Sequence, residues 1–159
     1  MTKAMSPLIA LAMLASALLT TASIATATAA GADTAGGADA PTITTAFEWA
    51  INVERGANNL PPLAIDDVES NQARAWSSVM AFTGTLAEDP GLAAATAAYE
   101  PGWTRAGENV GVGATSQSIE AALMASPPHR ANILGPYTHV GVGVVIAGGR
   151  LWITERFYG

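Results

Sequence analysis

Residues 138–158 read THVGVGVVIAGGRLWITERFY, and this stretch decides the fold. Apolar residues alternate with small ones before Gly148-Gly149, and with polar or aromatic ones after it. A period of two places successive side chains on opposite faces of a strand, and a Gly-Gly pair between two such runs is typical of a tight turn. The stretch therefore predicts an antiparallel hairpin.

Two helices are predicted earlier in the chain from their N-terminal caps. A capping box at Thr45 opens a helix that stops at Gly56, and a second box at Asp66 opens a helix that ends at Gly84. The apolar stripe expected on the second helix consists of Val68, Ala75, Trp76, Val79, Met80 and Phe82. Between the helices, the two prolines within residues 60–63 require an extended chain.

The middle of the chain is predicted as a loop, a strand and a helix. Proline and glycine pairs in residues 88–105 indicate a long loop with room for one helical turn. Residues 107–113 form a short strand, and residues 116–126 form a helix that Pro127-Pro128 breaks. Helices followed by antiparallel strands indicate the α+β class, and residues 43–159 have the size of a single domain.

The N-terminal segment has the features of a secretory signal. Lys3 precedes an uncharged apolar run over residues 8–22, and small-x-small cleavage sites follow near residues 27–30. A retained membrane anchor is the alternative, but the apolar run is shorter than the roughly 20 residues that span a bilayer. We therefore predict a signal peptide over residues 1–30 and secretion of the mature chain. Residues 31–42, rich in Gly, Ala and Asp, form a flexible spacer.

Composition excludes several classes of protein. The 159 residues include no cysteine, which rules out disulfide-stapled domains and Cys-ligated metal sites. The formal charge of -6 and the absence of a Lys/Arg cluster argue against a nucleic-acid partner. Once the signal is removed, no transmembrane segment is expected, and the oligomeric state is left open.

Few side chains are candidates for chemistry. His129 follows a Pro-Pro pair, where a turn is expected, while His139 projects from the polar face of a predicted strand. Glu108 lies at a strand entrance, where a carboxylate either accepts backbone hydrogen bonds or has a shifted pKa. Ser126 lies three residues before His129, but without a nucleophile elbow this pair is a weak signal for a nucleophile.

Taken together, the segments resemble the CAP superfamily (cysteine-rich secretory, antigen 5 and pathogenesis-related 1 proteins, or SCP-like domains), in its short, disulfide-free bacterial branch. The matching segments are Asn52–Arg55, Leu60–Leu63, Ala75-Trp76, Gly107–Val110, Ser126–Leu134, Val140–Gly143 and Trp152–Thr154. The resemblance implies a three-layer α-β-α sandwich around a mainly antiparallel sheet, with a cleft where two His and two acidic residues converge.

Two of the four cleft positions of the family match this chain. The resemblance places Glu108 at the Glu of the Gly-Glu-Asn motif and His129 at the second His. The first His is replaced by Glu88, the second acid falls near Ser126, and Leu123 replaces a Trp usual in the family. The expected cleft residues are Glu88, Glu108, Ser126 and His129, supported by Asn109 and Arg130.

The replacement of a His by Glu88 changes the metal that the cleft suits. Two imidazoles with carboxylates favour zinc, whereas Glu88, Glu108 and His129 form a harder set that favours Mg, Mn or Ca. Without a cation, two nearby carboxylates raise one another's pKa, so that a proton takes the place of the metal.

Three functions are weighed for such a cleft. The first is a secreted module that binds a lipid, a sterol or a cell-wall component, and the second is an extracellular interaction domain with a vestigial cleft. The third is a metal-assisted, peptidase-like hydrolase using Glu88, Glu108 and His129. Binding ranks first, and enzymatic activity is not expected, because no activated nucleophile is evident and a family His is missing.

Overall fold

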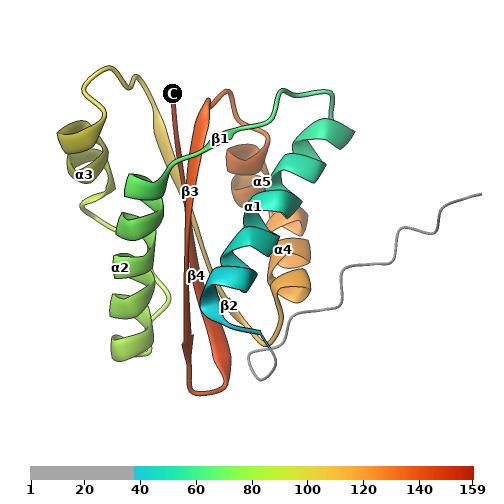
Figure 1. The fold of residues 1–159 in the computed structure, drawn as a ribbon, viewed down its shortest axis with the longest axis vertical. Coiled ribbons are helices and arrows are strands. Elements are labelled where there is room, and N and C mark those ends of the chain that lie inside the picture. The colour runs from blue at the N-terminus through green and yellow to red at the C-terminus, as the bar shows by residue number, and fades with distance from the viewer. Residues whose placement is uncertain (1–37) are drawn as a thin grey trace, which may run out of the picture.

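The computed structural model describes residues 38–159. The predicted signal and most of the predicted spacer lie outside the described residues. The elements are α1 (Ala40–Ala57), β1 (Ala64–Ile65), α2 (Asp67–Thr83), α3 (Leu92–Tyr99), β2 (Ala106–Gly113), α4 (Ser116–Ala125), α5 (Pro127–Ile133), β3 (His139–Ala147) and β4 (Arg150–Tyr158). One sheet, in the strand order β1-β3-β4-β2, lies between α1, α4 and α5 on one face and α2 and α3 on the other (Figure 1). The predicted α+β class and three-layer sandwich are confirmed.

The predicted hairpin forms the centre of the sheet. Strands β3 and β4 pair antiparallel, and Gly148 and Gly149 make the turn with φ angles of 59° and 70°. Such positive φ angles favour glycine, because a Cβ atom would clash there. Strand β2, also predicted, pairs antiparallel with the other edge of β4, and only the short β1 runs parallel to its neighbour β3. The sheet is therefore mainly antiparallel.

Alternation along β4 divides the core between the two faces of the sheet. Leu151, Ile153 and Phe157 are buried on the face that packs against α1, α4 and α5. The main apolar cluster consists of Ile43, Phe47, Ile51, Leu63, Ile119, Leu123, Ile133, Val140, Val142, Val144, Leu151, Ile153 and Phe157. The other face of β4 carries Trp152, Thr154, Arg156 and Tyr158. The first face thus holds the main apolar cluster together with Glu155, and the second face combines aromatic residues with buried polar groups.

Helix α2 packs on the sheet with a different face from the one predicted. Its buried residues are Glu69, Ser70, Ala73, Ser77 and Met80, whereas the predicted stripe members Val68, Val79 and Phe82 are exposed. The reason lies in β3, where Gly141 and Gly143 bring the sheet into contact with the helix backbone. The Ser70 hydroxyl accepts a hydrogen bond from Val142 N, and the Ser77 hydroxyl donates to Gly143 O. Close approach and hydrogen bonding determine the docked face.

Gly143→Ala should therefore weaken the docking of α2. A Cβ atom at Gly143 would overlap the backbone of Ala73 and Arg74, which cannot move without displacing the helix. We expect a loss of about 2 kcal/mol of unfolding free energy in urea denaturation, as for other overpacked sites. Gly56→Ala, in helix α1, is the control, because in the described part of the chain a Cβ atom at Gly56 would meet no atom within 4 Å outside its own stretch of the helix. This substitution should leave the unfolding free energy unchanged or raise it.

Helix α1 begins at Ala40 rather than at the predicted Thr45. Asp39 is the N-cap, and its carboxylate accepts a hydrogen bond from Thr42 N at 3.0 Å. Thr45 lies inside the helix, where its hydroxyl donates to Pro41 O. The predicted capping box is therefore wrong, and residues 40–42, assigned to the spacer, form the first turn of the helix.

The segments before and after strand β2 are more helical than predicted. Part of the predicted loop forms α3, which has eight residues. The Pro127-Pro128 pair ends α4 but also occupies the first positions of α5, where the missing N–H group of proline costs nothing. His129 is consequently the third residue of a short helix and not part of a turn. None of the described helices is long and apolar enough to span a membrane.

Candidate functional site

The Gly-Glu-Asn segment of β2 sends its two polar side chains to opposite faces of the sheet. In the strand register, Glu108 is opposite Arg156 and Asn109 is opposite Glu155. Both pairs are buried. We call the group Glu69, Asp89, Glu108 and Arg156 the Arg156 cluster, and the group Asn109, Glu120, Asn132 and Glu155 the Glu155 cluster. The predicted residues Glu108 and Asn109 therefore belong to two separate sites.

The Arg156 cluster lies between the sheet, α2 and the loop before α3. The guanidinium donates from Nε to Glu108 Oε2 at 3.0 Å and forms an ion pair with Asp89. Its Nη1 lies 3.9 Å from Glu69 Oε2. The second carboxylate oxygen of Glu108 accepts a hydrogen bond from Asp89 N at 2.6 Å. Arg156 therefore occupies the centre of three acidic side chains, and both oxygens of Glu108 have partners.

Burial dominates the electrostatics of this cluster. Burial raises the pKa of Glu108, against the opposing effects of the Asp89 N–H group and Arg156. Burial also raises the pKa of Glu69, which the Arg156 charge partly offsets. Three carboxyl groups share one guanidinium, so the cluster is short of positive charge whenever all three are ionised. Glu69 and Glu108 will therefore take up protons more readily than exposed carboxylates do.

The residues around Glu108 do not fit a divalent cation. Glu88, expected to be a metal ligand, is exposed, while Glu108 is held by Arg156 and by Asp89 N. Within residues 38–159, no group of three His, Asp or Glu side chains is arranged to hold a metal ion. The positive charge that the resemblance would assign to a metal is supplied here by a guanidinium that the chain itself carries.

His129 and Ser126 belong to the helical layer on the Asn109 side of β2, opposite the face that carries Glu108. The His129 carbonyl accepts a hydrogen bond from Asn109 Nδ2 at 3.2 Å, which ties α5 to β2. Ser126 lies between α4 and α5, and its backbone N–H donates to Ala122 O and Leu123 O. No hydrogen bond joins the Ser126 and His129 side chains in the described part of the chain. The structure thus gives no support for a Ser-His nucleophile.

The Glu155 cluster was not predicted from the sequence. Glu155 is completely buried, and its Oε2 accepts a hydrogen bond from Asn109 Nδ2 at 3.0 Å. Asn132 Nδ2 in turn donates to Asn109 Oδ1 and to Glu108 O, both at 2.9 Å. The carboxyl group of Glu120 in α4 lies close enough to that of Glu155 to raise its pKa. Two acidic side chains thus meet inside the apolar layer.

The two carboxyl groups cannot both be ionised without a large energetic cost. Burial and the neighbouring Glu120 raise the pKa of Glu155 well above its usual value. Burial, together with the charge of Glu54, raises the pKa of Glu120 to about 7. Adjacent carboxyl groups in a poorly solvated site favour protonation of one of them, because like charges repel strongly there. Burial and the neighbouring acid therefore both favour the protonated form of Glu155.

A third polar group lies where α2 begins. Tyr158 donates a hydrogen bond to the Asp66 carboxylate, which also caps α2 by accepting from Val68 N and Glu69 N. The His139 ring stacks on the Tyr158 ring with centroids 4.7 Å apart. His139 therefore has a packing role at the strand end.

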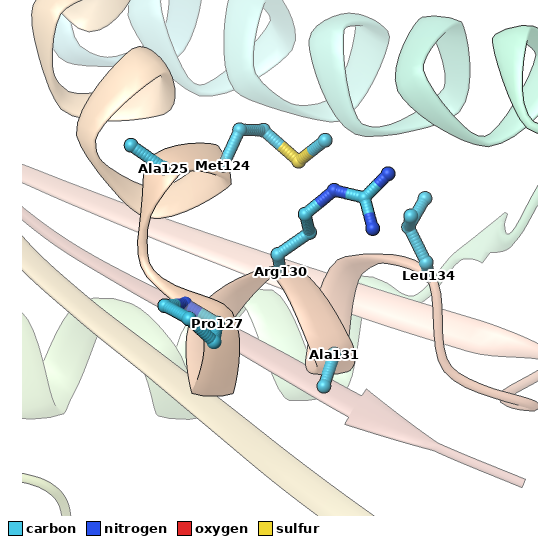
Figure 2. Close-up of a pocket in the computed structure, with 6 residues that line it drawn as sticks. All are labelled: Met124, Ala125, Pro127, Arg130, Ala131 and Leu134. Atoms are coloured by element: carbon cyan, nitrogen blue, oxygen red, sulfur yellow. The ribbon is translucent and has the colours of Figure 1, made fainter.

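A cavity of about 390 Å³ opens between α4 and α5. It is lined by Met124, Ala125, Pro127, Arg130, Ala131 and Leu134 (Figure 2). Figure 2 shows Arg130 extending from α5 between Met124 and Leu134. The guanidinium donates one hydrogen bond, to Asn58 Oδ1 beside the end of α1 at 3.2 Å. The cavity thus combines apolar walls with a single positive charge.

Two signals in the sequence could have indicated the missed residues. Glu155 stands at an apolar position in the alternation of β4, where a charged side chain is unexpected. Glu69 is the last residue of the capping box that begins at Asp66, and it also falls at the helical spacing of the residues of α2 that face the sheet. Neither signal identifies the partner of the buried charge, since Arg156 and Glu120 come from elements distant in the sequence.

Comparison with known proteins connects this geometry to a family. Residues 50–155 match the family described as "CAP: Cysteine-rich secretory protein family". The uncharacterized protein YkwD of Bacillus subtilis is 34% identical over 130 residues, covering 76% of this chain and 50% of YkwD. The chain therefore spans about half the length of this curated relative.

Solved structures show the same fold. An extracellular protein containing an SCP domain from Bacillus anthracis has 25% identity and a TM-score of 0.66, with 74% of this chain and 40% of that chain covered. An outer surface protein from Borrelia burgdorferi has 16% identity and a TM-score of 0.68, with 76% of this chain and 95% of that chain covered. At 16% identity, the similarity to the Borrelia burgdorferi protein indicates a shared fold and nothing more.

Proposed function

The chain belongs to the CAP family of cysteine-rich secretory proteins, and on this premise we propose that it is an extracellular binding module without catalytic activity. The ligand that the geometry favours has an apolar body and an anionic group, as a fatty-acyl carboxylate of the cell envelope does. The observation that carries this proposal is the cavity between α4 and α5, with Arg130 in its otherwise apolar lining.

The binding surface differs from the one that the resemblance implies. Glu108 is only 4% exposed, and both of its carboxylate oxygens have partners within the protein. A ligand would have to displace Arg156 to reach it. Arg130, by contrast, is exposed and makes one hydrogen bond across the helices. A guanidinium with free donors beside an apolar wall is suited to a carboxylate or phosphate attached to a chain.

An extracellular location accords with the rest of the data. Solved relatives are described as an extracellular protein and an outer surface protein. The signal predicted over residues 1–30 would direct the chain across a membrane, and cleavage would leave the domain without its apolar leader.

The alternative of a metal-assisted hydrolase receives no support from the residue arrangement. Such an enzyme needs an ion held by several ligands and an open position for a water molecule. In the described domain, Glu88 is exposed and Glu108 is already paired with Arg156, so these residues and His129 do not form that constellation. Glu108, which the resemblance assigns to the cleft, is paired with Arg156.

Arg130→Gln tests the binding proposal. We expect calorimetric titration with dodecanoate to show binding to the wild-type protein and about tenfold weaker binding to Arg130→Gln, because one charge-assisted hydrogen bond is lost. Dodecyltrimethylammonium, with the same chain length and a cationic head group, should bind no better to the wild type than to the variant.

The control for this experiment is Arg74→Gln, which removes an exposed arginine from α2, in the opposite helical layer. It should leave dodecanoate binding unchanged. Equal affinities of all three proteins for dodecanoate, or no binding at all, would contradict the assignment of the cavity to an anionic, chain-bearing ligand.

A further inference from the structure

The outward face of α2 carries a seam of apolar residues. Val68, Val79 and Phe82 are 43%, 45% and 93% exposed, and Ala75 is exposed between them. Together with Gln72, these residues occupy positions 68, 72, 75, 79 and 82, so that intervals of four and three residues alternate. This is the pattern of a helix that packs against another helix. An apolar aromatic side chain exposed to this degree is unfavourable for a domain that stays alone in water.

The seam points away from the domain's own core. At 100° per residue, the seam lies on the side of the helix opposite Ser70, Ala73 and Ser77, which face the sheet. The loop that follows α2 returns along a flank, where Trp76 Nε1 donates to Ala87 O at 2.8 Å. This loop does not cover the seam, whose apolar residues remain exposed. In the described part of the chain, α2 forms the outer layer on its side of the sheet (Figure 1).

The seam is complementary to itself when two copies run antiparallel. The register that places Val68 against Val79 of a second copy also places Gln72 against Ala75 of that copy. Phe82 then reaches past the start of the helix of the second copy, toward the end of β1, where Ile65 is 42% exposed. The pairing of Val68 with Val79 is reciprocal, as an isologous two-fold interface requires.

The composition of the seam is compatible with a second copy. The seam positions carry no charged side chain, so pairing places no ion in the interface. The formal charge of -6 opposes both docking on an anionic bilayer and the approach of a second copy, so the choice of a second copy rests on the self-complementary register. The small residue Ala75 near the middle allows the two helix axes to approach closely.

We propose that two copies of this protein associate through an antiparallel pairing of their α2 helices, centred between Gln72 and Ala75. This interface lies on the face of the sheet opposite the cavity of α4 and α5, and it does not depend on the proposed ligand. Ligand binding and self-association can therefore fail or succeed separately.

Light scattering coupled to size exclusion tests the association. The wild-type protein should show a concentration-dependent shift from monomer to dimer, and Phe82→Ser should raise the dissociation constant at least tenfold, since one aromatic contact is lost from each copy. Trp49→Ser is the control, because Trp49 is 63% exposed on α1 and outside the seam. Monomeric wild type at every concentration up to millimolar, or a dimer unaffected by Phe82→Ser, overturns the proposal.

Cysteine pairing tests the register, because the chain has no cysteine of its own. Val68 and Val79 are about 16 Å apart along one helix, too far for an internal disulfide, yet they face one another across the proposed interface. The double variant Val68→Cys/Val79→Cys should form a disulfide-linked dimer on mild oxidation. The two single variants, each with one cysteine, are its controls and should not form a disulfide-linked dimer under the same conditions. A crosslinked dimer from either single variant would indicate a parallel pairing and overturn this register.

Discussion

Arg156→Met should destabilise the domain by about 3–5 kcal/mol at pH 7.5, the range measured when one partner of a buried ion pair is removed. Arg156 is 1% exposed and is in contact with Glu108 and Asp89, with Glu69 nearby. Methionine fills much of the same volume, so the loss arises mainly from three carboxyl groups left without a counter-charge. Glu108 also loses the donor to its Oε2.

The effect of Arg156→Met should depend on pH. Burial already raises the pKa of Glu69 and Glu108, and removal of the guanidinium raises it further. A group with a raised pKa in the folded state binds a proton that the unfolded chain releases, so its contribution to stability is present at low pH and is lost as pH rises. The variant should therefore be closer to the wild type at pH 5 than at pH 7.5.

Urea unfolding followed by tryptophan fluorescence at the two pH values measures both effects. Arg150→Met is the matched control, because Arg150 is exposed at the start of the same strand and should change the unfolding free energy by less than about 0.5 kcal/mol. A loss at pH 7.5 as small as that of the control would show that Arg156 is not the cation that holds these carboxylates.

Glu155→Gln should stabilise the domain above pH 5, by an amount that grows with pH. Glu155 is fully buried, and its pKa in the folded state is raised well above the usual value, whereas in the unfolded chain it ionises as an ordinary carboxyl group. Between the unfolded and the folded pKa, each pH unit costs the wild type up to about 1.4 kcal/mol. Glutamine is neutral, its oxygen can accept from Asn109 Nδ2, and its amide can donate to the neighbouring Glu120.

The advantage of Glu155→Gln should therefore increase between pH 5 and pH 8, with a slope of at most about 1.4 kcal/mol per pH unit, which is the slope of one proton. Denaturant titrations at each pH measure this difference directly. Glu54→Gln, which changes a half-buried neighbour of Glu120, should show a much smaller slope. Parallel pH profiles of Glu155→Gln and the wild type would mean that Glu155 is ionised when folded.

The two clusters differ in how they manage a buried acid. On the α2 face, Arg156 supplies a charge to Glu108, while on the α4 face the neighbouring Glu120 raises the pKa of Glu155. Both carboxylate oxygens of Glu108 accept hydrogen bonds, whereas the oxygens of Glu69 and Glu120 are buried without a hydrogen-bond partner among the described residues. Burial therefore disfavours the ionised form of these acids on both faces of the sheet.

Local patterns determined much of this fold. The period of two in residues 138–158 and the Gly148-Gly149 pair predicted the hairpin, because side-chain alternation and positive φ angles depend only on neighbouring residues. The cap at Asp66 was also predicted correctly, since a short polar side chain satisfies N–H groups two and three residues away. The α+β class and the family resemblance followed from such segments in order.

The tertiary structure decided which faces and charges meet. The helix period alone favoured Val68, Val79 and Phe82 as the buried stripe of α2, but Gly141 and Gly143 of a distant strand admit the opposite face. The sequence identified Glu108 as a site residue, yet the register between β2 and β4 gives it Arg156 as a partner and sends Asn109 to the other face. Period and capping are properties of a short segment, whereas strand register and helix docking depend on the packing of the whole domain.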